Sequence, residues 1–139
     1  MQFSVSLRRV GMGVLGAALA VPAPGAARAE RVASLNLCTD QLALMLADHK
    51  DIIGLSTLAR DCTASVLCHQ AQDMPVLQST AETVLSANPD VVLAGPFTAR
   101  LAVRAPREVG AKLLTLPPPS SLAAVPDQLI PVAHVVGRP

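Results

Sequence analysis

The sequence contains no tryptophan and no tyrosine, and only two phenylalanines occur among its 139 residues. Proteins that bind single-stranded nucleic acids stack the bases on aromatic side chains, and few residues here can do so. The chain also lacks a surplus of positive charge, since 11 basic residues stand against 10 acidic ones and the basic residues form no cluster. A nucleic-acid interface concentrates Lys and Arg on one face. These absences argue against a nucleic acid as a partner.

The apolar content is high, at 51%, and only 15% of the residues are charged. A chain of this composition does not remain disordered, because disorder requires low hydrophobicity and a high net charge. Its length fits one domain and hardly two. We therefore expect a single folded domain with one modest core.

Residues 1–29 have the three-part arrangement of a secretory signal peptide. The segment starts with Arg8 and Arg9, continues with an apolar and glycine-containing run at 10–21, and ends with the small-x-small site Ala27-Arg28-Ala29. We expect cleavage after Ala29, so that residues 30–139 form an exported mature chain.

The same residues leave other routes open. The apolar run can serve as an N-terminal anchor helix, although it is shorter than the roughly 20 residues that span a bilayer. The pair Arg8-Arg9 is compatible with twin-arginine export as well as with the general secretory pathway, but Leu7 precedes it where Ser or Thr is typical. A lipid anchor is disfavoured, because the first cysteine, Cys38, lies beyond the cleavage site.

Short apolar segments alternate with helical patterns in the mature chain. The expected strands or extended pieces lie at residues 31–37, 52–55, 74–77, 91–94 and 113–116. The expected helices follow Thr39, Ser79, Thr98 and Ser120. Strands that are apolar on both faces are typical of a parallel sheet covered on both sides. The sequence therefore predicts an α/β fold with a parallel sheet flanked by helices, in which ligands bind at the carboxyl ends of the strands.

Polar residues at the expected helix starts predict the caps. Thr39 is the expected cap of a helix in which Leu42, Met45 and Leu46 share one face. Ser79 and Glu82 fit a capping box, in which each side chain bonds to the backbone of the other residue.

Two prolines conflict with the expected helices. Pro106 falls inside the helix at 98–109, and Pro131 falls inside the last helix. An interior proline costs about 3 kcal/mol, which is large against a typical stability of about 5–15 kcal/mol. Either the helices break there, or the chain is a weakened, truncated copy of a larger protein. Pro126, in contrast, suits the first turn of a helix.

Several segments together resemble the periplasmic substrate-binding proteins of ABC importers for cobalamin and ferric siderophores. These segments are Arg31 to Asp40, Ile53 to Ser56, Ala81 to Leu85, Asn88 to Gly95 and Val135 to Pro139. Their order and spacing match that family over nearly all of the mature chain. In the family, two α/β lobes joined by one long helix hold the ligand between them.

The resemblance implies that residues 30–139 are a Rossmann-like N-terminal lobe, which stops about where the connecting helix begins and lacks the C-terminal lobe. It implies a periplasmic, non-catalytic protein that captures an iron chelate (a siderophore or haem) or cobalamin and delivers it to the ABC transporter permease without a cofactor. Ligand choice depends on both lobes, so the sequence does not name the ligand. The alternatives are an exported thiol enzyme or redox protein, and a truncated fragment without function.

Five residues in the expected ligand-side loops are candidates for binding: Asn36, Ser56, Arg60, Phe97 and Arg100. A guanidinium group binds carboxylate, phosphate or catecholate oxygens with two hydrogen bonds, so we expect Arg60 and Arg100 to face one cleft. Phe97 is expected to pack on a flat ligand face. The alternatives are that both arginines are ordinary solvated charges and that Phe97 anchors a helix start.

Glu82 has two possible roles. The resemblance implies that an acid in this helix pairs with arginines of the permease. The local alternative is that Glu82 only completes the capping box with Ser79. The two roles are compatible with each other.

Three cysteines are present. Export favours oxidation, so Cys62 and Cys68 can close a short loop, which leaves Cys38 as a buried thiol. Whether the two are bridged is left open, because the sequence does not give their geometry.

Neither catalysis nor metal binding is expected. Cys38 near a helix start is the nucleophile of the thiol-enzyme alternative, but none of the three histidines, His49, His69 and His134, can be placed beside it. Cys62, Cys68 and His69 are the candidate metal ligands, yet their spacing matches no usual zinc site. We therefore assign no catalytic residue and no metal ligand.

Overall fold

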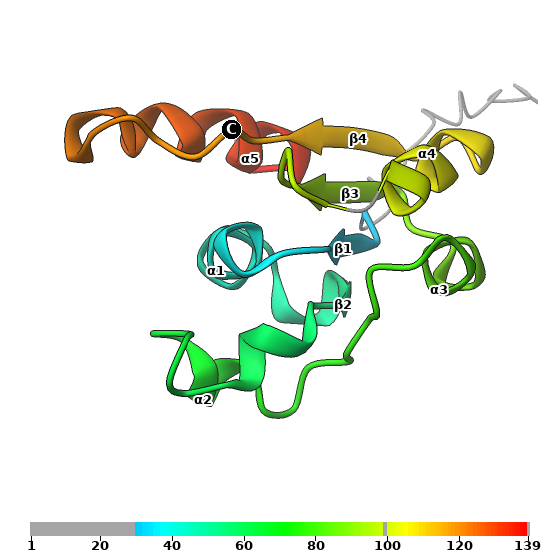
Figure 1. Ribbon diagram of the computed structural model, residues 1–139, viewed down its shortest axis with the longest axis horizontal. Helices are drawn as coiled ribbons and strands as arrows, with labels where there is room; N and C mark the ends of the chain where they lie inside the picture. Colours follow the sequence, from blue (N-terminus) through cyan, green and yellow to red (C-terminus); the bar gives the residue numbers. More distant parts are fainter. Residues whose placement is uncertain (1–29, 99, 139) are drawn as a thin grey trace, which may run out of the picture.

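The computed structural model describes residues 30–98 and 100–138, so the expected signal peptide lies outside the described residues. Four strands form one sheet in the order β2-β1-β3-β4, and every neighbouring pair is parallel (Figure 1). The strands are β1 (Val32–Ser34), β2 (Ile52–Gly54), β3 (Val91–Ala94) and β4 (Lys112–Thr115). This sheet confirms the predicted α/β class.

The sheet is covered by helices on both faces. The α-helices are α1 (Leu37–Leu46), α2 (Cys68–Ala71), α3 (Ala81–Ala87), α4 (Arg100–Glu108) and α5 (Pro126–Val135). Three short 3-10 helices are η1 (His49–Asp51), η2 (Thr57–Arg60) and η3 (Leu122–Ala124). Helices α1 and α5 pack on one face, and α3 and α4 pack on the other (Figure 1). Among the described residues, no helix is both long and apolar enough to cross a membrane.

Alternating side chains of the strands build two cores. Val32, Val91 and Leu93 pack beneath α1 and α5, whereas Ala33 and Val92 pack beneath α3 and α4. Successive strand residues point to opposite faces, so a strand buried on both faces is apolar throughout. β3 is buried at all of its positions for this reason.

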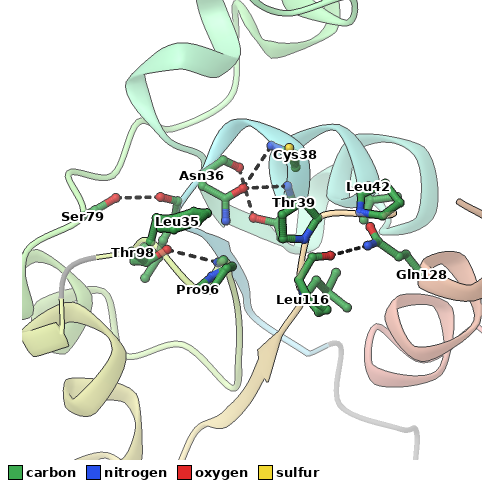
Figure 2. Close-up of a pocket in the computed structure, with 15 residues that line it drawn as sticks. Leu35, Asn36, Cys38, Thr39, Leu42, Ser79, Pro96, Thr98, Leu116 and Gln128 are labelled. Atoms are coloured by element: carbon green, nitrogen blue, oxygen red, sulfur yellow. Dashed lines mark hydrogen bonds between the residues drawn. The ribbon is translucent and has the colours of Figure 1, made fainter. Parts of the chain in front are cut away.

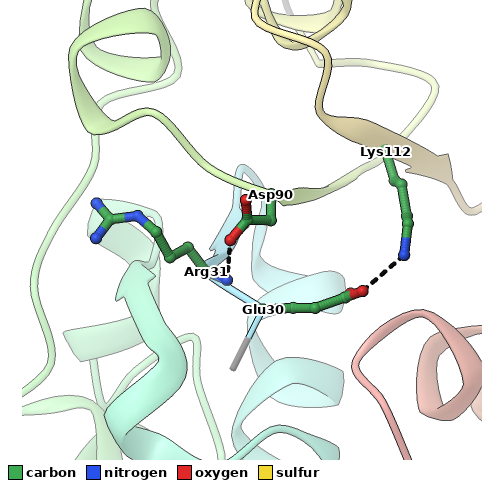
Figure 3. A network of polar contacts seen from close by, with 4 residues as sticks. All are labelled: Glu30, Arg31, Asp90 and Lys112. Carbon is green, nitrogen blue, oxygen red and sulfur yellow. Dashed lines mark hydrogen bonds and ion pairs between the residues drawn. The ribbon is translucent and has the colours of Figure 1, made fainter. Parts of the chain in front are cut away.

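Polar contacts hold the amino ends of three strands together. Asp90, just before β3, accepts a hydrogen bond from the backbone N–H of Arg31 at 2.9 Å, and Lys112 of β4 pairs with Glu30 at 2.6 Å (Figure 3). The Arg31 side chain also donates to the carbonyls of Ala87 and Asn88 at the end of α3. These contacts lie at the end of the sheet opposite to the one where ligands are expected.

The start of α1 differs from the prediction. Asn36, not Thr39, is the N-cap, and its Oδ1 accepts from the backbone N–H groups of Cys38 at 3.0 Å and Thr39 at 3.2 Å. Thr39 is buried in the first turn, where its Oγ1 lies 2.7 Å from Oγ of Ser34. Both residue types cap well, but β1 ends early and the helix begins directly after Asn36.

The predicted buried face of α1 is wrong at one position. Leu42 is buried and Leu46 is half-buried, but Met45 is 54% exposed. The helix buries Leu42, Ala43 and Leu44 because the sheet, α5 and η2 all pack against it. The buried surface is therefore broader than one stripe and is turned away from Met45.

The predicted capping box of α3 is also wrong. Thr80 is the N-cap and accepts from the N–H of Thr83 at 3.3 Å, while Ser79 donates its hydroxyl to the carbonyl of Leu35 at 2.8 Å. Glu82 lies in the first turn and is exposed. It therefore has no role in a box with Ser79.

The helices continue through their interior prolines. Pro106 lies within α4 and Pro131 within α5, so of the two alternatives offered by the sequence the breaking of the helices is wrong. Pro126 occupies the first turn of α5, as predicted. Pro106 is fully buried against the α3 face of the molecule, and this burial offsets part of the cost of the missing hydrogen bond.

The predicted extended piece at 74–77 makes only one bridge to the sheet edge. Leu55 and Val76 form this parallel bridge, in which the N–H of Leu77 donates to the carbonyl of Leu55 at 2.7 Å. A Cβ atom on Gly54 would lie 2.7 Å from Cβ of Leu77, so the close approach requires glycine.

A disulfide joins Cys62 to Cys68, whose Cα atoms lie 5.1 Å apart, so the pairing that the sequence left open is present. Cys38 is exposed, and the expectation of a buried thiol is wrong. The cysteine lies in the first turn of α1, where the chain leaves the sheet.

Reduction of this disulfide is expected to lower the free energy of unfolding by at most about 2 kcal/mol, because the closed loop is short and constrains the unfolded chain little. Urea unfolding of the oxidised protein and of a Cys62→Ser/Cys68→Ser double variant measures the difference. A Cys38→Ser variant controls for the loss of a thiol. The expected loss in free energy of unfolding is at most about 2 kcal/mol, so a loss of about 4 kcal/mol or more would contradict the prediction.

Candidate functional site

The strand order creates a crevice at the carboxyl ends of β1 and β3. The chain runs from β1 outward to β2, and then crosses to β3 and β4 on the other side of β1. In open α/β sheets, ligands bind where the strand order reverses in this way, because the loops of neighbouring strands diverge there. The loops that follow β1, β3 and β4 surround this point.

A pocket of about 320 Å³ lies at this point (Figure 2). Most of its lining is apolar. It is lined by Leu35, Asn36, Cys38, Thr39, Leu42, Ser79, Gly95, Pro96, Phe97, Thr98, Leu116, Pro117, Pro118, Pro119 and Gln128. The lining thus comes from three of the predicted ligand-side loops, those after β1, β3 and β4, together with the first half of α1, Ser79 before α3 and Gln128 of α5.

Asn36 presents an unused donor at the base of the pocket. Its Oδ1 caps α1, but its Nδ2 is buried and has no hydrogen-bond partner among the described residues. A Cβ atom on Gly95 would lie 3.0 Å from this Nδ2, so glycine lets the loop after β3 come close to the amide. A buried donor without a partner is costly, and a ligand oxygen at this position would satisfy it.

The walls of the pocket are fixed by local hydrogen bonds. Thr98 accepts from the N–H of Gly95 at 3.1 Å and holds the turn after β3. On the other side, the amide of Gln128 on α5 donates to the carbonyl of Pro117 (Figure 2). Three consecutive prolines, Pro117 to Pro119, have restricted backbones and form a stiff wall. Phe97 is 92% exposed at the rim, so it is not the buried anchor of a helix start.

A second pocket of about 340 Å³ adjoins the first and is basic. It shares Gly95, Pro96 and Thr98 with the first pocket, and it adds Arg100 and Arg104 of α4. Both arginines are exposed. The combined surface is therefore apolar at the switch point of the sheet and carries two positive charges at one side.

Two of the predicted site residues have partners inside the protein. The guanidinium of Arg60 donates to the carbonyls of Ala71 and Met74, and Arg60 lines none of the pockets described for residues 30–98 and 100–138. Ser56 is buried and donates both its N–H and its hydroxyl to Asp40. The structure brings Asn36, Phe97 and Arg100 together and places Ser56 and Arg60 elsewhere.

Asp40 is a buried acid that the sequence analysis did not single out. It lies in α1, is fully buried, and accepts from the N–H of Ser56 at 3.1 Å. Burial raises the pKa of this carboxyl, and the hydrogen bonds from Ser56 and Ser34 oppose that rise. Asp40 thereby joins α1 to the segment that follows β2. An acid in the first turn of a helix that is otherwise apolar was the signal that could have identified it.

Solved structures of periplasmic haem-binding proteins have the same fold. BhuT in complex with two haems is 21% identical with a TM-score of 0.60, and the match covers 78% of this chain and 41% of BhuT. A tyrosine-to-alanine variant of HmuT is 21% identical with a TM-score of 0.62, over 80% of this chain and 35% of HmuT. Apo RhuT from Roseiflexus sp. RS-1 is 20% identical with a TM-score of 0.56, and the match covers 78% of this chain and 44% of RhuT. No family model matches the sequence, and no curated protein is significantly similar to it.

The chain spans less than half the length of these three proteins. About four-fifths of this chain is aligned in each of the first two matches. The predicted resemblance to periplasmic substrate-binding proteins is confirmed at the level of the fold: the chain has the fold of the aligned part of these periplasmic haem-binding proteins.

Proposed function

We propose that residues 30–139 are one α/β lobe of an exported, periplasmic substrate-binding protein, and that residues 1–29 are its signal peptide. The lobe supplies one wall of a ligand site and passes its cargo to the permease of an ABC importer. Among iron chelates and cobalamin, we propose haem as the cargo. The haem-binding neighbours support the class of ligand, and the two adjoining pockets support haem in particular.

The observation that carries the proposal is the junction of an apolar pocket with an arginine-lined one. Haem is a flat apolar macrocycle with two carboxylates on one edge. The apolar pocket offers Leu35, Leu42 and the proline wall to the macrocycle, and Arg100 and Arg104 lie where the carboxylates would emerge. A hydrophilic siderophore would bind the apolar pocket weakly, because its polar groups would be buried there without hydrogen-bond partners.

The proposed role is capture without bond chemistry. The described lining of the apolar pocket includes Cys38 but no histidine, aspartate or glutamate. A thiol nucleophile is activated by an adjacent base or by a position at a helix start, and Cys38 has the helix start without a base in the described lining. The thiol-enzyme alternative is therefore less well supported than binding.

Replacing both arginines, Arg100→Ala and Arg104→Ala, is expected to weaken haem binding about five- to tenfold, because two exposed ion pairs contribute roughly 0.2–1 kcal/mol each. Haem is titrated into the purified protein and followed by absorbance. Arg107→Ala is the matched control, since Arg107 lies on the same helix but lines neither pocket. The dimethyl ester of protoporphyrin, which lacks carboxylate charges, is the matched ligand.

The esterified porphyrin should bind the wild type and the double variant equally. Haem affinity that stays within twofold of the wild type in the double variant would contradict the assignment of the carboxylates to these arginines. Absence of binding by either porphyrin to the wild-type protein at high micromolar concentration would contradict haem as the cargo.

A second prediction concerns docking on the permease. Glu82 is exposed on α3, so Glu82→Gln should leave the unfolding curve unchanged while it removes one negative charge from the proposed docking surface. We expect slower haem uptake by cells that carry the importer and the complete binding protein. Glu108→Gln, at the exposed end of α4, is the control. Uptake that is the same in both variants and the wild type would argue against a docking role for Glu82.

A further inference from the structure

Three metal-ligand side chains come together where the loop after η2 meets α2: Cys62 lies in the loop, and Cys68 and His69 lie in α2. Cys62, Cys68 and His69 each offer one ligand atom, and these atoms all lie within 4.8 Å of one another. Cys62 and His69 are exposed, whereas Cys68 is buried. None of the three lines the apolar or the basic pocket, so the cluster is separate from the proposed haem site.

The spacing of these atoms suits a tetrahedral ion. Zinc binds thiolate sulfur at about 2.3 Å and imidazole nitrogen at about 2.0 Å, which separates neighbouring ligand atoms by about 3.5–3.8 Å. The nitrogen of His69 lies within 4.8 Å of both sulfur atoms, so it has to approach each of them by at most about 1.3 Å to reach that separation. The two sulfur atoms are bonded to each other and must move apart by less than 2 Å, roughly the difference between a disulfide and a pair of zinc ligands.

The loop is held in place by contacts that do not involve the disulfide. Asp61 accepts from the N–H and the hydroxyl of Thr63, at 2.8 Å and 2.7 Å. The side chain of Gln72 donates to the carbonyls of Arg60 and Cys68, at 3.1 Å and 3.0 Å. The guanidinium of Arg60 donates to the carbonyl of Ala71. These bonds keep η2 against α2 when the sulfur–sulfur bond is broken.

We propose that Cys62, Cys68 and His69 form a redox-controlled zinc site. A dithiol reductant transfers two electrons and two protons to the disulfide, becomes a disulfide itself, and leaves Cys62 and Cys68 as thiols. Zinc then binds both sulfur atoms and one nitrogen of His69, the two thiol protons pass to solvent, and a water molecule completes the tetrahedron. In the reverse direction a small-molecule disulfide accepts two electrons from the two thiolates and two protons from solvent, becomes a dithiol, restores the bond between Cys62 and Cys68 and releases the zinc ion. Thiolate and imidazole ligands select zinc over magnesium and calcium.

The exposure of Cys62 permits this exchange, because thiol–disulfide exchange begins when a thiolate attacks an accessible sulfur. Asp61, the residue before Cys62, accepts from the N–H and the hydroxyl of Thr63, and these bonds hold the start of the loop in place. Cys68 and His69 are adjacent in sequence, and both lie in the single turn of α2.

The experiment titrates zinc ions, in competition with a chromophoric chelator, into the purified protein in its oxidised form and after reduction and anaerobic removal of the reductant. We expect the reduced protein to bind one zinc ion at least about 100-fold more tightly than the oxidised protein. His69→Ala should weaken zinc binding to the reduced form about tenfold or more, through loss of one ligand. With cobalt ions, the reduced protein should show thiolate charge-transfer absorption, which Cys62→Ser should lose.

Two variants serve as matched controls. Cys38→Ser removes the third thiol, and His49→Ala removes an exposed histidine outside the loop; neither should change zinc affinity. Equal affinity of the oxidised and reduced forms would overturn the proposal. So would equal affinity of reduced wild type and His69→Ala, or a reduced protein whose circular dichroism is that of an unfolded chain.

Discussion

Replacing Asp40 by alanine is expected to lower the free energy of unfolding by about 3 kcal/mol, because the change leaves two buried donors without an acceptor. The N–H and the hydroxyl of Ser56 both donate to the Asp40 carboxylate, and both residues are buried. Urea unfolding followed by circular dichroism measures the loss. Asp48→Ala is the matched control: Asp48 is exposed and pairs with Arg138 at the surface, so its removal should cost less than about 1 kcal/mol.

The stability of the protein should also depend on the ionisation of Asp40. Burial raises the pKa of this group above the value of 3.8 that it has in the unfolded chain. The folded state therefore holds the proton more tightly, so the contribution to stability is present in full below pH 3.8 and is lost as the pH rises through the raised pKa. Asp61 acts in the opposite direction, since its pKa is lowered by Thr63 and its contribution is lost as the pH falls.

Asp40→Asn separates these two contributions. The amide oxygen can still accept from the N–H of Ser56, so this variant should lose less stability than Asp40→Ala, and it should lack the part of the pH dependence that belongs to Asp40. If Asp40→Asn and the wild type show the same change of unfolding free energy between pH 3.5 and 7, a range around the ordinary carboxyl pKa of about 4, burial does not perturb Asp40. Equal losses for Asp40→Ala and Asp48→Ala would contradict the role of the buried bonds.

Pro131→Ala is expected to stabilise the protein by about 2 kcal/mol. The substitution restores an N–H in the middle of α5 and removes the clash of the proline ring with the preceding turn, a penalty of about 3 kcal/mol. Alanine also gives the unfolded chain more conformational freedom, which reduces the gain in free energy of unfolding by up to about 1 kcal/mol. Thermal unfolding should show a rise in Tm of about 8–16 °C, given about 4–8 °C per kcal/mol for a domain of this size.

Pro126→Ala is the control for this prediction. Pro126 occupies the first turn of the same helix, where its missing N–H would have no partner in the helix. We expect a change of Tm near zero or slightly downward for this variant. A fall in Tm for Pro131→Ala would mean that the helix is adapted to the proline, and that its packing against the core outweighs the restored hydrogen bond.

The strands were the most predictable part of the fold. β3 has the predicted bounds, Val91 to Ala94, because a run of apolar residues after Asn-Pro-Asp and before Gly-Pro can hardly form anything but a buried strand. The cap of α1 was less predictable, because Asn36 and Thr39 are both good caps three residues apart. The helix begins after Asn36 because β1 ends at Ser34. The end of β1 depends on its pairing with β3, which is remote in sequence.

The site was predictable only as a set of loops. The rule for open parallel sheets led to the loops after β1, β3 and β4, and Asn36, Phe97 and Arg100 do lie at the pockets there. Arg60 also lies on a loop of this kind, yet its guanidinium bonds to carbonyls of a segment without any periodic pattern. The sequence did offer Cys62, Cys68 and His69 as candidate metal ligands, but their spacing matches no usual zinc site, and it is the disulfide and the single turn of α2 that bring them together.

The strand order also determines when the sheet can form. β1 is the first strand in the chain, but its partner β3 comes much later, as the contact between Arg31 and Asp90 across 59 residues illustrates. Closing a loop of that length lowers the entropy of the chain before the strand pairing can stabilise it. Sheets built from distant strands therefore fold slowly. A nascent chain therefore has no stable centre until β3 has emerged.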